Sequence, residues 1–131
     1  TNTVDDDTIP QNTEGDQYMS LAITPTNVNN KLLVDVVAYG AIDSLNHINM
    51  ALFKDDVAAA LIATGAVTPG AHQRNLPVLK YIMVAGTLSS ILFKVRIGPE
   101  SSGTYTFNGA GGGRHFGGVA SSSIVITEVV V

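Results

Sequence analysis

The stretch SSILFKVRIG, residues 89–98, decides the fold class of this chain. Its apolar side chains recur at every second position, which is the period of a β-strand with one buried face; they are Ile91, Phe93, Val95 and Ile97. The stretch LNHINMALFK, residues 45–54, repeats the pattern, with Ile48, Met50 and Leu52 on one side of the strand. We therefore expect both stretches to be strands and these side chains to lie in the core.

Six further runs of β-type composition surround these two and are separated by turn residues such as PTNVNN and GPESSG. They span residues 17–24, 31–40, 57–65, 76–86, 104–109 and 121–131. Strands that follow one another about every ten residues, with no clear helix between them, predict an all-β antiparallel sandwich or barrel of about eight strands. The run 57–65, VAAALIATG, is ambiguous because alanine and leucine favour helices, but its shortness between two turns favours a strand.

Two of the expected strands are apolar on both faces. In LLVDVVAY, residues 32–39, the face that carries Asp35 also carries three apolar or aromatic side chains, namely Leu33, Val37 and Tyr39. Residues 125–131, VITEVVV, are apolar on both faces except at Glu128. A strand of this kind needs two coverings. The second covering is either a neighbouring subunit, with Leu33, Val37 and Tyr39 as its candidate contacts, or a loop of the same chain.

The composition argues against several classes of protein. A chain of 131 residues without cysteine is most simply one domain, with no disulfide framework and no thiolate metal site. Seven basic against eleven acidic residues offer no basic stripe for nucleic acid. The longest apolar run, residues 57–63, falls far short of the ~20 residues of a membrane helix, so we expect no membrane insertion. The scarcity of charge suggests that other copies of the chain cover much of its surface.

Residues 1–16 differ from the rest of the chain. They are polar, include the acidic run Asp5–Asp7, and contain little that could be buried. We therefore expect an extended N-terminal arm or linker, followed by a β-sandwich domain over residues 17–131. The sequence begins at Thr1 without a methionine, and we expect it to be part of a longer polypeptide.

The glycine-rich stretch NGAGGGRHFGG, residues 108–118, is not a phosphate-binding loop. No lysine follows Lys94, which excludes a Walker loop, and Arg114 and Phe116 stand where a dinucleotide-binding motif needs glycine. We expect a structural bend that begins with a hairpin turn at Asn108–Gly109. The glycines of this bend are Gly109, Gly111, Gly112, Gly113, Gly117 and Gly118.

The side chains with catalytic or metal-binding chemistry show no informative spacing. His47, His72 and His115 are far apart and form neither a His-x-His nor a His-Glu-x-x-His motif. A threefold axis could bring together one histidine from each of three chains, but nothing in the sequence selects which one. The chain has no Gly-x-Ser-x-Gly motif, and its acidic runs lack the spacing of a calcium loop. We expect no catalytic site, no metal site and no cofactor.

Four blocks of the sequence resemble a β-sandwich domain of bacteriophage tail-fibre and other virion structural proteins. They are ITPTNVNNKLLVDVVAYG (23–40), ALFKDDVAAALIA (51–63), LKYIMVAGTLSSILFKVRIGP (79–99) and TFNGAGGGRHFGGVASSSIVITEV (106–129). The order and spacing of the blocks match over residues 20–128, with departures at Lys54, Asp56 and His115. The resemblance implies a jelly-roll-like sandwich that assembles as a homotrimer at or near the end of a virion fibre.

The resemblance also implies a function. Such domains serve as tips, caps or trimerisation units, and some bind glycans or proteins of the host surface. We expect a non-enzymatic structural or receptor-binding domain of a virion, with recognition in the loops 41–47, 65–75 and 98–104, because loops vary without disturbing a sandwich. The candidate contacts in these loops are Asp43, His72, Gln73, Arg74 and Glu100.

Two alternative functions imply a different binding partner. A capsid decoration or head-fibre protein would attach to other virion proteins, and the arm 1–16 would suit that attachment. A monomeric carbohydrate-binding module would stack aromatic side chains on a sugar ring, but the chain has no tryptophan and only four tyrosines. The tyrosines that could stack in this way are Tyr39, Tyr81 and Tyr105.

Overall fold

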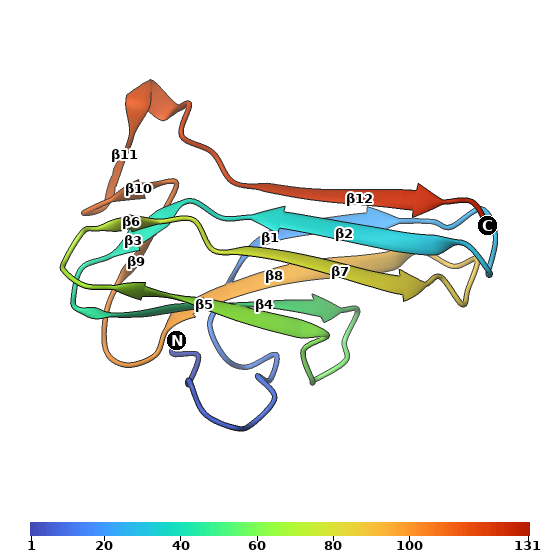
Figure 1. Ribbon diagram of the computed structural model, residues 1–131, viewed down its shortest axis with the longest axis horizontal. Helices are drawn as coiled ribbons and strands as arrows, with labels where there is room; N and C mark the ends of the chain where they lie inside the picture. Colours follow the sequence, from blue (N-terminus) through green and yellow to red (C-terminus); the bar gives the residue numbers. More distant parts are fainter.

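The computed structural model describes all 131 residues as an all-β chain (Figure 1). The longer strands are β1 (Asp16–Ile23), β2 (Lys31–Val37), β4 (Asn46–Lys54), β5 (Ile62–Thr68), β7 (Val78–Val84), β8 (Ile91–Pro99) and β12 (Ser123–Val129). The short strands are β3 (Gly40–Ile42), β6 (Arg74–Asn75), β9 (Tyr105–Phe107), β10 (Gly109–Ala110) and β11 (Gly113–Arg114). The only helical element is a 3₁₀ turn, η1 (Phe116–Gly118), and none of the structure is a helix of the length and apolarity needed to cross a bilayer.

Two antiparallel sheets form the body of the molecule and enclose one core. The strand order is β1-β8-β4-β5 in the first sheet and β12-β2-β7 in the second. The inner faces supply the core side chains, which include Leu32, Val34, Val36, Ile48, Met50, Leu52, Ile91, Phe93, Val95 and Ile97. Each side chain that the alternation of residues 45–54 and 89–98 assigned to the core is no more than 1% exposed. The prediction of an all-β, sandwich-like fold is therefore confirmed.

The strand expected at residues 57–65 is displaced along the chain. Strand β5 begins at Ile62 and continues through Thr68, so residues 65–68 are not part of a loop. After β4, the N–H of Val57 donates to the carbonyl of Lys54 (3.1 Å) and closes a turn. The next residues contact the N-terminal arm, where Ala59 bridges to Gln11. The turn and this bridge occupy the backbone that sequence analysis assigned to the strand.

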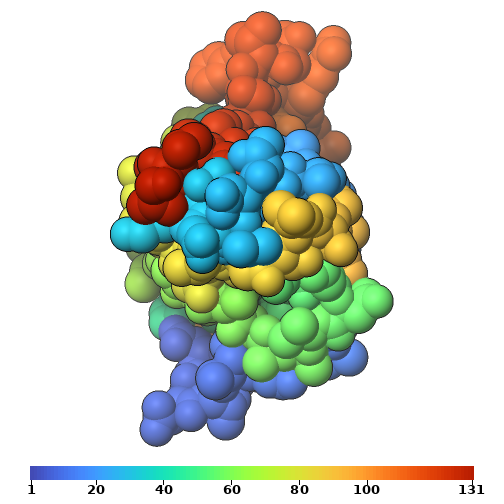
Figure 2. Space-filling view, turned by 90° about the vertical axis from the view of Figure 1, so that its right-hand side faces the viewer, coloured from blue at the N-terminus to red at the C-terminus, as the bar shows by residue number.

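A small sheet, β6-β3-β9, lies at one end of the sandwich, and residues 109–121 leave it as a projecting segment that we call the glycine lobe (Figures 1 and 2). Side chains close the base of this lobe. The hydroxyl of Ser122 donates to the side-chain carbonyl of Asn108 (2.7 Å) and accepts from the N–H of Tyr39 (2.8 Å). The N–H of Asn108 in turn donates to the carbonyl of Tyr39 (2.7 Å).

The turn of the glycine lobe is at Gly111–Gly112, not at Asn108–Gly109 as expected from the sequence. Strands β10 and β11 pair Ala110 with Gly113, which leaves two residues in the turn. Their φ angles are 60° and 78°. A two-residue hairpin turn with both central residues in the left-handed region suits glycine, because a β-carbon there is strained. The tight turn of the glycine stretch therefore lies three residues later than the sequence predicted.

Tyr105 is the first residue of β9 in the small sheet, and its ring packs over Gly40 of β3. The side chain is 9% exposed, and its hydroxyl has no hydrogen-bond partner. A β-carbon at Gly40 would collide with the phenol of Tyr105, so this position requires glycine. The ring also makes an edge contact with Tyr18, whose centroid is 5.2 Å away. Aromatic side chains thus seal this end of the core.

The N-terminal arm packs against the outer side of the first sheet (Figure 2). The N–H of Thr3 donates to the carbonyl of Pro99 (2.8 Å), and the amide of Asn49 donates to the carbonyl of Thr3 (2.9 Å). The guanidinium of Arg96 donates to the carbonyls of Glu14 (2.7 Å) and Gly15 (2.6 Å). The arm therefore covers strand β4, whose outward side chain Phe53 is buried.

Candidate functional site

The second sheet, unlike the first, has an apolar outer face that nothing in the chain covers. We call it the outer face; its apolar side chains are Leu33, Val37, Val78, Ile82, Val84, Val125 and Val129. Ile82 is 55% exposed and Val125 is 51% exposed. The inward side chains of the same strands already fill the core. This face is the second apolar side that the sequence predicted for residues 32–39 and 125–131.

A few polar residues interrupt the outer face. Lys80 forms an ion pair with Asp35 (3.1 Å between Nζ and Oδ1) across strands β2 and β7. Exposed pairs of this kind contribute little to stability. Tyr39 is not part of the outer face, because β2 ends at Val37 and the phenol of Tyr39 lies 3.1 Å from Nδ1 of His115 in the glycine lobe. Of the three residues expected at the interface, Leu33 and Val37 lie on this face, whereas Tyr39 contacts the glycine lobe.

The three loops expected to carry recognition gather at one end of the sandwich, at the left of Figure 1. They are shorter than expected, because strands β3, β4, β5, β6 and β8 extend into them. Asp43 and Thr104 join two of the loops, since the N–H of Thr104 donates to Oδ1 of Asp43 (2.8 Å). This bond from the Thr104 N–H is the main cause of the lowered pKa of Asp43. Asp43 therefore positions the loops.

The remaining loop candidates lie around the same end. The N–H of His72 donates to the carbonyl of Ile42 (2.7 Å), which joins the loop after β5 to strand β3. Gln73 is exposed in this loop, and Arg74 belongs to β6, where it pairs with Ala41. The glycine lobe approaches His72 at Gly111. The structure thus brings Asp43, His72 and the lobe together, but it does not bring them to Glu100.

The aromatic side chains do not form an exposed row. Tyr105 is buried, Tyr81 packs against the core, and the phenol of Tyr39 faces His115. Phe116 at the tip of the glycine lobe is the exception, since it is 71% exposed. Its φ of 50° is rare for a bulky residue and costs conformational energy. A sugar-stacking platform made of tyrosines is therefore absent.

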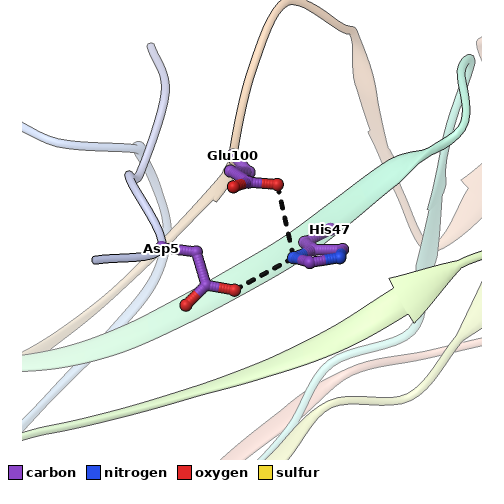
Figure 3. Close-up of side chains that lie close together, drawn as sticks. All are labelled: Asp5, His47 and Glu100. Carbon is purple, nitrogen blue, oxygen red and sulfur yellow. Dashed lines mark hydrogen bonds and ion pairs between the residues drawn. The ribbon is translucent and has the colours of Figure 1, made fainter. Parts of the chain in front are cut away.

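Glu100 instead belongs to a cluster with Asp5 and His47 (Figure 3). Nδ1 of His47 lies 2.9 Å from Oδ2 of Asp5 and 3.3 Å from Oε2 of Glu100. The three side chains come from the N-terminal arm, from strand β4 and from the loop after β8. Asp5 and His47 also line a cavity of about 380 Å³ between the arm and strand β5.

The register of two strands places two of the three side chains of this cluster. Ile48 of β4 pairs with Pro99 of β8 and points inward, so the neighbouring residues His47 and Glu100 lie side by side on the outer surface. The N–H of Glu100 donates to the carbonyl of His47 (3.1 Å) and fixes this arrangement. The spacing of the three histidines in the sequence did not predict a contact between His47 and the acid of the arm.

Neither a scan against protein-family models nor a search of curated proteins finds a match to this chain.

Proposed function

We propose that this chain is a non-enzymatic structural domain of a virion, and that it assembles as a homotrimer through the outer face. The observation that carries the proposal is the apolar outer face, which leaves side chains such as Ile82 and Val125 about half exposed. Contiguous apolar surface of this kind is characteristic of sites that bind another protein. The occupant we assign to it is a second copy of the same chain, in line with the tail-fibre domains that the sequence resembles.

The sequence of strands favours a jelly-roll-like arrangement within each subunit. The chain passes from β1 in the first sheet to β2 in the second, and later from β7 in the second sheet to β8 in the first. These crossings place strands that are distant in sequence beside each other, such as β2 beside β12. Antiparallel sheets with connections of this kind are typical of viral structural domains.

The outer face alone is smaller than a standard subunit interface. Three strands of seven residues cover about 14 by 23 Å, or about 320 Å², at the usual strand spacing and rise. A standard interface buries about 800 Å² on each partner. We expect the remainder to come from exposed apolar residues that extend the face along its strands, namely Leu76 before β7 and Val130 and Val131 after β12.

We assign recognition of a host-surface glycan or protein to the loop end of the sandwich. His72 and Arg74 provide polar groups there, and Phe116 adds an exposed aromatic side chain on the neighbouring glycine lobe. A trimer would present three copies of this end, which raises avidity without any new contact.

The test of the assembly is the native mass of the purified chain, measured by light scattering after size exclusion over a dilution series. The proposal predicts a mass three times the 13.7 kDa of one chain. The double variant Ile82→Lys/Val125→Lys places two charges on the outer face and should give a folded monomer with an unchanged far-ultraviolet circular dichroism spectrum.

The control is Val57→Lys, which introduces a single lysine charge away from the outer face, at a residue that is 51% exposed in the turn after β4. This variant should keep the wild-type mass. A wild-type chain that is monomeric at the highest concentration tested, or a double variant that keeps the wild-type mass, would overturn the proposal.

A further inference from the structure

The convergence of Asp5, His47 and Glu100 leaves one carboxylate without a hydrogen bond. Nδ1 of His47 carries at most one hydrogen, and Asp5 at 2.9 Å is the carboxylate placed to accept it. The side chain of Glu100 has no other hydrogen bond or cationic partner, and neither has that of Asp5. Two carboxylates that face one imidazole nitrogen therefore carry more negative charge than a single proton satisfies.

The distances within the cluster are close to those of ligands around one metal ion. Two ligands bonded to the same tetrahedral zinc ion lie about 3.3–3.6 Å apart. The two distances from His47 Nδ1 are 2.9 Å and 3.3 Å, and all three donor atoms lie within 4.8 Å of one another. An ion between the three side chains would thus need only small movements of exposed carboxylates.

We propose that Asp5, His47 and Glu100 form a binding site for a divalent transition-metal ion, with Zn²⁺ as the preferred occupant. One imidazole nitrogen and two carboxylate oxygens are a ligand set that Zn²⁺ accepts, whereas Ca²⁺ and Mg²⁺ prefer oxygen ligands only. The +2 charge of the ion balances the two carboxylates. Water completes the coordination, with room in the adjoining cavity of about 380 Å³.

The backbone on each side of the site is already fixed. Strands β4 and β8 hold His47 and Glu100 side by side through their register. Two residues before Asp5, Thr3 is buried and bonded to both Pro99 and Asn49. Little conformational entropy is therefore lost when an ion binds, which favours affinity.

The ion would join the N-terminal arm to the sandwich. Its ligands come from residues 42 positions apart at Asp5 and His47, so the metal would close a long loop. Binding to the folded state alone raises stability in proportion to the logarithm of the metal concentration above the dissociation constant. The predicted role is a clamp that keeps the arm docked over β4.

The test is a calorimetric titration of the chain, free of any affinity tag, with Zn²⁺, and with Ca²⁺ in parallel. The proposal predicts one Zn²⁺ per chain and binding at least tenfold weaker in Asp5→Asn, His47→Asn and Glu100→Gln. Two matched controls should stay within twofold of the wild type. These are Asp7→Asn, an exposed acid in the same arm, and His72→Asn, whose φ of 60° asparagine tolerates.

Two further measurements distinguish this site from loose surface binding. The ¹⁵N resonance of Nδ1 in His47 should shift with Zn²⁺ while those of His72 and His115 stay in place. Amide hydrogen exchange of residues 3–8 should slow at least tenfold with Zn²⁺ in the wild type and not in Asp5→Asn. Absence of saturable Zn²⁺ binding, tighter binding of Ca²⁺, or equal losses in the control variants would overturn the proposal.

Discussion

Replacement of Tyr105 by phenylalanine should stabilise the protein. The hydroxyl of Tyr105 is buried against Gly40 and has no hydrogen-bond partner. A buried polar group without a partner costs about 1–3 kcal/mol, while removal of the oxygen forfeits only a few dispersion contacts. We therefore expect Tyr105→Phe to raise the free energy of unfolding by ~1 kcal/mol. At ~2.1 cal/mol/K per residue of unfolding entropy, this corresponds to a rise in Tm of about 4 °C.

The pH dependence gives a second measure of the same side chain. Burial, with a smaller effect from Tyr18, raises the pKa of the Tyr105 phenol above its usual range. The unfolded phenol ionises near pH 10 and the folded one does not, so its contribution to stability is complete below pH 10 and is lost as the pH rises further. The expected loss is ~1.4 kcal/mol per pH unit. The free energy of unfolding of the Tyr105→Phe variant should fall less steeply with pH than that of the wild type, by this amount.

The assay is urea unfolding at a fixed protein concentration, at pH 7 and at intervals from pH 10 to 11.5. Fixed concentration matters because the stability of an oligomer depends on it. Tyr39→Phe is the matched control, since its hydroxyl contacts Nδ1 of His115 and its loss should not stabilise the protein. A Tyr105→Phe variant that is less stable than the wild type at pH 7 would mean that the hydroxyl is hydrogen-bonded in solution, and would refute the reasoning.

Three further substitutions test the packing described above. Gly98→Val should release the N-terminal arm, because a β-carbon there would lie 2.7 Å from Oγ1 of Thr3. Hydrogen exchange of residues 1–16 measures the release, and unchanged protection of these residues would contradict the prediction. Glu128→Gln should weaken the protein above pH 4.5, and its difference from the wild type should disappear as the pH falls below 4.5, because bonds led by the Asn30 amide lower the pKa of Glu128 in the folded state. Acid unfolding followed by circular dichroism tests the sign. Gly40→Ala should cost about 1–3 kcal/mol through overpacking, less in the Tyr105→Phe background, and strict additivity in urea unfolding would argue against the contact.

The strands with strict alternation were predictable from the sequence. Residues 89–98 and 46–54 have one apolar face each, and burial of that face decides their orientation. The run 57–65 was not predictable in the same way, because its alanines fit a strand, a helix or a loop equally well. Its placement depends on the bridge from Ala59 to Gln11, and the polarity of the arm gives no sign of that contact.

The candidate site was predictable only in part. The two-sided apolar pattern of Leu33 and Val37 pointed to the outer face, because alternation assigns a face without any tertiary information. The cluster of Asp5, His47 and Glu100 left no such signal, since its members are brought together by the β4–β8 register and by the docking of the arm. The pairing of Ile48 with Pro99 would have placed His47 beside Glu100, but register follows from the fold and not from spacing.

The closed base of the glycine lobe has a consequence for how this protein can diversify. Asn108 and Ser122 are joined by a hydrogen bond, and between them only Gly109 is buried. The sandwich therefore fixes where the lobe starts and ends, but its own folding does not depend on the length, shape or sequence of the lobe. New segments can be exchanged at this position, by evolution or by design, while the strands beneath keep folding as before.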